Sequence, residues 1–154
     1  HDLPIDIIIR NIENIQKGKP ASAFYGEPGV TPVFGIEAGL HEEASSFETA
    51  VACVCKLLQN VDMLAGRFEV EKKPYSEFFI NGSIFFPNES YELSKVFKSF
   101  EPFEAGQLIA EGDGNSIVAQ SAGHIIFPPP GKKPTASLTD EVLFLSAPVK
   151  TVEV

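Results

Sequence analysis

The sequence predicts an α+β protein, with a short α/β part over residues 1–63 and a small β barrel or sandwich over residues 64–154. Three observations predict this. Apolar residues recur at helical spacing in the first sixty residues. That periodicity largely stops near residue 64. Short β-like runs separated by turn residues fill the remainder. We therefore expect two domains of different character.

The first part is expected to contain a helix, a strand and a second helix. Residues 3–17 are predicted to be helical, because isoleucines recur three to four positions apart. Residues 30–37 are predicted to form a buried strand. The second helix is expected to begin with a capping box formed by Ser45 and Glu48. Its apolar face comprises Phe47, Ala50, Val51, Val54, Leu57, Leu58 and Val61.

Such an α/β part looks incomplete. Only one interior strand is evident, whereas a parallel sheet needs several strands that are covered on both faces. We therefore expect the first sixty residues to be the end of a larger sheet domain, in a chain cut from a longer protein. The open edge and apolar faces of an isolated half-sheet favour self-association into a homo-oligomer.

The second part is predicted from β-like runs and turn signals. The dipeptide Asn81-Gly82 and residues 111–115 have the composition of tight turns. The expected strands lie at 67–72, 77–80, 83–86, 106–110, 116–120, 123–127 and 142–147. Strands this short, with turns between them, indicate a barrel or sandwich.

Charge and composition exclude several classes of partner. The chain has 154 residues and a net charge of −9, which repels nucleic-acid backbones and anionic membrane surfaces. It contains no apolar run long enough to cross a bilayer and no secretory signal pattern. Cys53 and Cys55 are expected to be small buried residues in a reducing compartment, without a disulfide. A cytoplasmic location is therefore predicted.

Metal ligands and nucleophiles are not evident. None of the histidines His1, His41 and His124 belongs to a recognised zinc-binding pattern. His124 adjoins an apolar β run and is expected to be structural. Ser45 and Ser46 lack a Gly-x-Ser-x-Gly context and are better explained by helix capping. We therefore assign no metal-binding and no cofactor-binding residue.

Glu37 is the main candidate for catalysis. It ends the apolar, β-rich run 31–39, and open α/β sheets bind ligands beyond the ends of such strands. A carboxylate against apolar walls can act as a general base or acid. The alternative is that Glu37 caps the next helix. Other polar residues that could line a cleft are Tyr25, Glu42, Glu43 and Arg67, although Glu42 and Glu43 also suit the positive end of a helix dipole.

Several motifs carry a family likeness. Residues 34–39, Phe-Gly-Ile-Glu-Ala-Gly, resemble the strand that bears the catalytic glutamate in the succinylglutamate desuccinylase/aspartoacylase family. That family belongs with the zinc carboxypeptidase-like folds. Residues 97–110, the turn at 112–114 and the run 125–130 resemble its C-terminal β domain in the same order.

The resemblance implies a terminal piece of a zinc carboxypeptidase-like layer followed by a barrel-sandwich-hybrid-like domain. It implies a deacylase that hydrolyses the amide bond of N-acyl amino acids with Zn²⁺ held by a His-x-x-Glu pair and a later His. Glu37 matches the catalytic position, where it would take a proton from water and pass it to the leaving nitrogen. The His-x-x-Glu pair is missing from this sequence, so we expect the chain alone to be inactive. The rival hypothesis is a non-catalytic, β-rich binding or interaction module.

Overall fold

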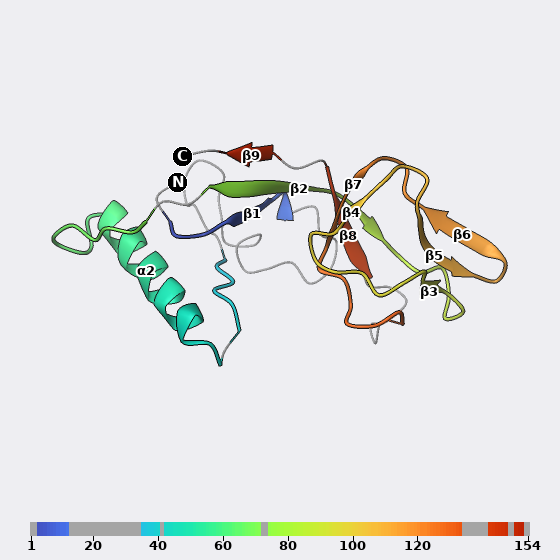
Figure 1. Ribbon diagram of the computed structural model, residues 1–154, viewed down its shortest axis with the longest axis horizontal. Helices are drawn as coiled ribbons and strands as arrows, with labels where there is room; N and C mark the ends of the chain where they lie inside the picture. Colours follow the sequence, from blue (N-terminus) through green and yellow to red (C-terminus); the bar gives the residue numbers. More distant parts are fainter. Residues whose placement is uncertain are drawn as a thin grey trace.

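A computed structural model describes residues 3–12, 35–40, 42–71, 74–133, 142–147 and 150–152 of the chain. It is an α+β structure with one mixed sheet of six strands and one antiparallel sheet of three strands (Figure 1). The elements are β1 (Ile7–Arg10), α2 (Ala44–Asn60), β2 (Tyr75–Ile84), β3 (Glu92–Leu93), β4 (Pro102–Phe103), β5 (Leu108–Gly112), β6 (Asn115–Val118), β7 (Gly123–Ile126), β8 (Leu143–Ser146) and β9 (Lys150–Val152).

The long strand β2 connects the two parts of the mixed sheet. Its first half pairs in parallel with β1 and antiparallel with β9. Its second half pairs antiparallel with β8, which continues the sheet to β7 and β4. The register shifts between Ile80 and Gly82. The predicted turn at Asn81-Gly82 is therefore wrong, because pairing with β8 holds this dipeptide in the strand as a bulge-like irregularity.

Strand β1 lies within the range where the first helix was predicted. The prediction of a helix over residues 3–17 is wrong for 3–12, and residues 13–17 lie outside the described part of the chain. Three consecutive β-branched isoleucines suit a strand of a parallel pair, because their side chains are stiff and disfavoured in a helix. Asn11, with φ 60°, follows the strand directly.

Side chains reinforce the pairing of β1 with β2. The Arg10 guanidinium donates from Nε and Nη2 to Glu77 Oε1, at 3.1 and 2.6 Å. Glu77 is buried while Arg10 remains half exposed. The ion pair therefore links residues that are 67 positions apart in the chain.

The hydrophobic core lies in the β-rich part. Its buried members come from both sheets and from the loops between them: Ile84, Phe86, Tyr91, Leu93, Phe97, Phe103, Ile109, Ala110, Ala119, Ile125, Val142 and Leu143. Strands β5 and β6 form the predicted tight hairpin through Asp113 and Gly114, whose φ values are 49° and 74°. Positive φ at both central residues is the geometry that Asp-Gly favours. The turn prediction is confirmed.

Helix α2 is present as predicted, but its start differs. The N-cap residue is Glu43, which makes no side-chain capping bond, and Ser45 lies inside the first turn. The predicted capping box of Ser45 and Glu48 is therefore wrong. The predicted strand at 67–72 is also absent over residues 67–71. The other six β-like runs all overlap β2, β5, β6, β7 or β8, with shifted ends.

Candidate functional site

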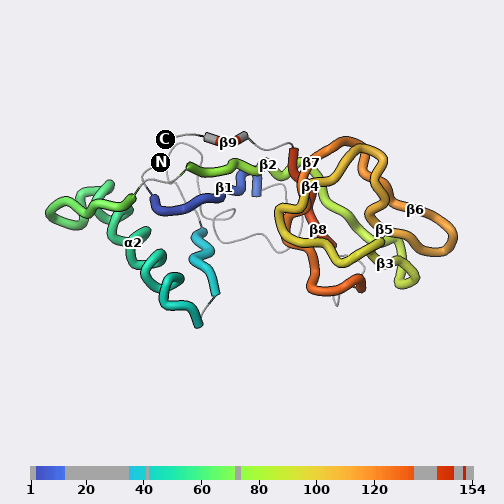
Figure 2. Tube along the Cα trace, viewed as in Figure 1, coloured from blue at the N-terminus to red at the C-terminus, as the bar shows by residue number. Residues whose placement is uncertain are grey.

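Glu37 lies in a segment without regular secondary structure. Residues 35–40 form no strand in the structure, and Glu37 is exposed. The predicted strand over 30–37 is thus wrong for 35–37, while 30–34 lie outside the described residues. The segment runs beside α2 before the helix begins (Figure 2), and a Cβ placed on Gly39 would lie 2.5 Å from Ser46 Oγ. The segment therefore lies close to the helix and forms no strand over residues 35–40.

The described residues leave Glu37 without polar partners. Its carboxylate makes no hydrogen bond or ion pair with any residue that the structure describes. It does not cap the following helix, because that position belongs to Glu43. The capping alternative for Glu37 is therefore wrong. An accessible carboxylate remains, and its role in catalysis stays a prediction.

The other polar candidates do not gather around Glu37. Glu42 and Glu43 are exposed immediately before α2, where the positive end of the helix dipole favours acids. Arg67 pairs with Glu69 at 2.9 Å, and both side chains are largely in solvent. An ion pair this exposed contributes little to stability. Tyr25 lies outside the described residues.

Histidine 124 occupies a packed position in strand β7. Its ring meets the Phe78 ring edge-on, with 5.4 Å between centroids. Its Nδ1 is buried and has no hydrogen-bond partner. Removal from water lowers the pKa of the His124 imidazole, because the charged form loses its hydration. His124 is packed, as expected of a structural residue, but its Nδ1 lacks a hydrogen bond.

Neither cysteine of α2 belongs to a metal-binding group among the described residues. Cys53 is a free, fully buried thiol whose pKa is raised by burial, while Cys55 is half-buried and free. The described residues contain no group of three or more His, Cys, Asp or Glu side chains that could hold a metal ion. His1 and His41 fall outside them. The donor set present in the described residues therefore does not fit Zn²⁺.

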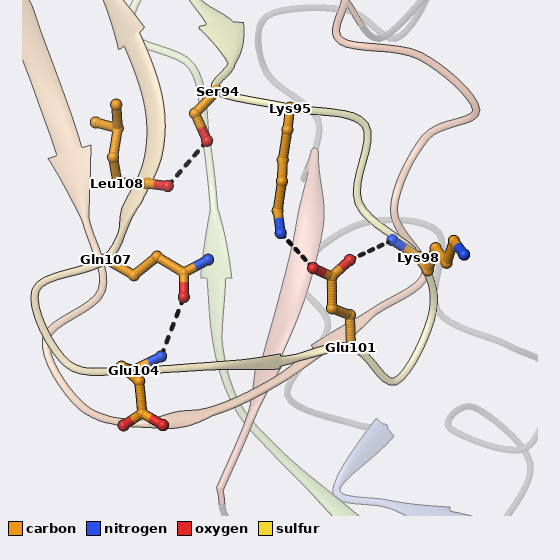
Figure 3. A network of polar contacts seen from close by, with 7 residues as sticks. All are labelled: Ser94, Lys95, Lys98, Glu101, Glu104, Gln107 and Leu108. Carbon is orange, nitrogen blue, oxygen red and sulfur yellow. Dashed lines mark hydrogen bonds and ion pairs between the residues drawn. The ribbon is translucent and has the colours of Figure 1, made fainter.

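The sequence did not reveal one polar network, which Figure 3 shows. Lys95 Nζ donates to Glu101 Oε1, and the Lys98 backbone N–H donates to Glu101 Oε2 at 3.0 Å. The bond from Lys95, followed by that from Lys98, lowers the pKa of the Glu101 carboxyl. Lys95 also lies 5.1 Å from the centre of the Phe97 ring. These contacts stabilise the loop that leads into β4.

The same network continues into the next turn. Ser94 Oγ donates to the Leu108 carbonyl at 2.9 Å, and the Glu104 backbone N–H donates to Gln107 Oε1 at 3.2 Å. Apart from the side-chain pair Lys95–Glu101, these bonds each join a side chain to a backbone group. The spacing of these residues follows neither helical nor strand periodicity, so no sequence pattern predicts the network. The network serves structure and offers no open group for catalysis.

No family model and no curated protein matches this sequence. Solved structures do match. A Shewanella frigidimarina protein has 14% identity over 70% of this chain and 31% of its own, with a TM-score of 0.46. A Shewanella amazonensis protein has 13% identity over 70% of this chain and 32% of its own, with a TM-score of 0.45. Both carry the description succinylglutamate desuccinylase/aspartoacylase.

A variant of murine aminoacylase 3 also matches, with 18% identity over 77% of this chain and 40% of its own, and a TM-score of 0.45. The family resemblance noted in the sequence thus recurs among the matching structures. The chain spans roughly a third to two-fifths of the length of these proteins. No helix in the described residues is long and apolar enough to cross a membrane. At such low identities and TM-scores, the matches transfer no residue, metal or substrate to this chain.

Proposed function

We propose that this chain is the C-terminal part of a zinc-dependent amidohydrolase, a deacylase that hydrolyses the amide bond of N-acyl amino acids. The observation that carries the proposal is the order of four family-like motifs, from residues 34–39 through 125–130. Three of them fall in one continuous β-rich region. Phe97, Phe103, Ile109 and Ile125, from these motifs, share the hydrophobic core. Motifs that pack together support a common origin better than scattered matches would.

Glu37 is the proposed general base and acid. It would accept a proton from the attacking water and deliver it to the leaving nitrogen, a role that needs a carboxylate within about 3 Å of that water. The exposed side chain is accessible for such contact. The described residues do not enclose it, so the walls of the site must come from elsewhere in the enzyme. The proposal therefore requires a further structural element around Glu37.

The zinc of this proposal would also be held elsewhere. No described cluster of side chains fits the metal, so its ligands are assigned outside the described residues. We derive no part of the role of Glu37 from the metal. The substrate would be a small N-acyl amino acid in the cytoplasm, and the net charge of −9 supports the exclusion of nucleic acid and anionic membrane as partners.

A second candidate is a non-catalytic binding module. The observation that favours it is the exposure of large apolar side chains on and after α2, among them Phe47 and Met63. Exposed apolar surface of this kind marks interaction sites in soluble proteins. Under this hypothesis the β-rich module binds a partner through this surface on and after α2, and Glu37 has no chemical role.

Substitution of Glu37 in the complete enzyme separates the two candidates. Glu37→Gln keeps the size of the side chain but removes the base, so kcat for an N-acyl amino acid should fall by ~10²–10⁴-fold. Zinc content should be unchanged. The matched control is Glu89→Gln, at an exposed position of the β-rich part. Full turnover in Glu37→Gln would remove this residue from the mechanism, and a parent enzyme without zinc or hydrolysis would favour the binding module.

A further inference from the structure

The dipeptide Asn81-Gly82 has the composition of a turn, but the fold does not use it as one. Both residues lie inside β2, the long strand in Figure 1, at the place where its register with β8 shifts. Ile80 pairs with Ser146 and Gly82 pairs with Leu145, so Asn81 has no paired residue on β8. The extra residue of a bulge is left out of the ladder. The backbone at Asn81 is therefore less constrained than that of its neighbours in the strand.

The Asn81 side chain is also unoccupied. It is exposed, and its amide makes no hydrogen bond with any residue in the described ranges. The other two asparagines of residues 74–133 differ in this respect. Asn88 Oδ1 accepts a bond from the Ser90 N–H at 2.9 Å, and its Nδ2 donates to Asp113 Oδ2 at 2.8 Å. Asn115 Nδ2 donates to the Asp113 carbonyl at 3.2 Å. The amide of Asn81 is therefore the one that is free to move among these three.

Gly82 leaves the next backbone nitrogen open to the Asn81 side chain. A Cβ at position 82 would meet Leu145 at 3.9 Å and nothing closer, which is an ordinary contact. The φ of Gly82 lies outside the left-handed region. Neither packing nor backbone conformation therefore requires glycine here. Its missing Cβ does remove the group that would shield the Gly82 nitrogen from Asn81 Cγ, and it leaves the backbone freer to rotate.

We propose that Asn81-Gly82 is a site of spontaneous covalent modification in the folded chain, where Asn81 is converted into aspartate and iso-aspartate. The Gly82 backbone nitrogen gives up its proton and attacks Asn81 Cγ. A bond forms between this nitrogen and Cγ, the Cγ–Nδ2 bond breaks, and Nδ2 takes up a proton and leaves as ammonia. Water then opens the cyclic imide, at Cγ to give aspartate or at the Asn81 backbone carbonyl to give iso-aspartate. Water is the only other reactant, so the modification is independent of the proposed amide hydrolysis.

The two products affect β2 differently. Each adds one negative charge to a chain whose net charge is already −9. Iso-aspartate also lengthens the backbone by one methylene group between Ile80 and Ile84, which are both buried. A close-packed interior does not absorb such a displacement of one isoleucine relative to the other without loss of contacts. The iso-aspartyl form should therefore be less stable than the aspartyl form, and the change falls on the strand that connects the two parts of the mixed sheet.

The test incubates the full-length folded protein in neutral buffer and then measures the masses of its proteolytic peptides. Replacement of the amide by a hydroxyl raises the mass of the peptide that contains Asn81, and chromatography separates its two products. The peptide that contains Asn88 should keep its amide and serves as the internal control. Gly82→Ala is the matched variant, because the structure admits its methyl group. Conversion of Asn81 should be roughly tenfold slower in this variant, which corresponds to about 1.4 kcal/mol in activation free energy.

Three results would overturn the proposal. Conversion in urea but not in the folded protein would show that pairing with β8 protects the dipeptide. Equal conversion of Asn81 and Asn88 in the folded protein would show that the bulge has no part in it. Equal rates in the parent and in Gly82→Ala would remove the glycine as the cause. Asn81→Asp supplies the charge without the extra methylene group, so its Tm should match that of the parent and lie above that of the purified iso-aspartyl form.

Discussion

Replacement of Gly123 by alanine should destabilise the β-rich part sharply. Gly123 opens β7, lies opposite Phe103 of β4 and is buried. A Cβ at this position would lie 2.0 Å from the Ser146 carbonyl oxygen and 3.0 Å from the Phe103 ring. The obstacle on one side is backbone of β8, which cannot rotate away as a flexible side chain would. Strands β7 and β8 must therefore separate locally to admit one methyl group.

The size of the effect follows from that displacement. Contact distances below 3.0 Å are essentially never seen for a real Cβ, so the strand backbones must part by at least 1 Å. Inserting a methyl group into a packed site typically costs about 1–3 kcal/mol. Because the clash is with backbone, Gly123→Ala should lower the free energy of unfolding by an amount near the upper end of this range, about 2–3 kcal/mol. For a chain of this size that corresponds to a fall in Tm of roughly 5–10 °C.

Urea unfolding followed by circular dichroism measures this loss, with Gly131→Ala as the control. A Cβ on Gly131 would meet nothing within 4 Å, so that variant should stay within about 0.5 kcal/mol of the parent. The urea dependence of the free energy should be similar in all three proteins. A Gly123→Ala protein as stable as Gly131→Ala would show that β7 and β8 do not approach as closely as the structure places them.

Two further outcomes are expected. Because burial lowers the pKa of His124 in the folded state, the unfolded chain binds the proton more readily, and stability should fall as pH drops through about 6.5. In His124→Phe, the stability measured by thermal unfolding should depend less on pH in this range. A pH dependence equal to that of the parent chain would show that His124 is not its cause. Arg10→Met should lower the free energy of unfolding by about 1–2 kcal/mol, because it leaves the buried Glu77 carboxylate without its partner. The effect is limited because Arg10 is half exposed and solvent screens the ion pair. Adding Glu77→Gln should recover part of that loss, and no recovery would mean that the pair is not coupled.

Elements governed by local sequence were predictable. The helix at α2 follows from apolar residues at helical spacing, and its bounds differ from the prediction mainly at the first turn. The hairpin between β5 and β6 follows from Asp113 and Gly114, which adopt positive φ at low cost. In both cases the residues that determine the structure lie within a few positions of one another.

Elements governed by distant pairing were not predictable. Isoleucines near the start of the chain fit a helical stripe, but pairing with β2, some 69 positions away in Ile7↔Ser76, makes residues 7–10 a strand. Asn81-Gly82 has the composition of a turn, but antiparallel pairing of β2 with β8 keeps it extended. Short patterns cannot report partners so far along the chain, and tertiary pairing overrides local preference.

The candidate site shows the same limit. The type of residue at position 37 could be recognised from its neighbours in sequence, and the family likeness gave it a role. Its surroundings could not be predicted, because burial depends on segments that approach from elsewhere. Glu37 proved exposed rather than enclosed at a strand end. The Lys95–Glu101 network was missed for a related reason, since it depends on the path of a loop.

Burial is distributed unevenly along the described residues, and this bears on function. The largest fully buried side chains are Ile80, Leu93, Ile109, Ile125, Ile126 and Leu143, all in or after β2, with Cys53 as the counterpart in α2. Glu37 and three large apolar side chains of α2, Phe47, Val51 and Val54, by contrast, precede β2 and are exposed. Apolar surface left in water costs free energy in proportion to its area, so a stable assembly should cover it. Under the proposed function, Glu37 and the exposed apolar side chains of α2 therefore lie on the same stretch of chain, and a single covering segment would enclose both.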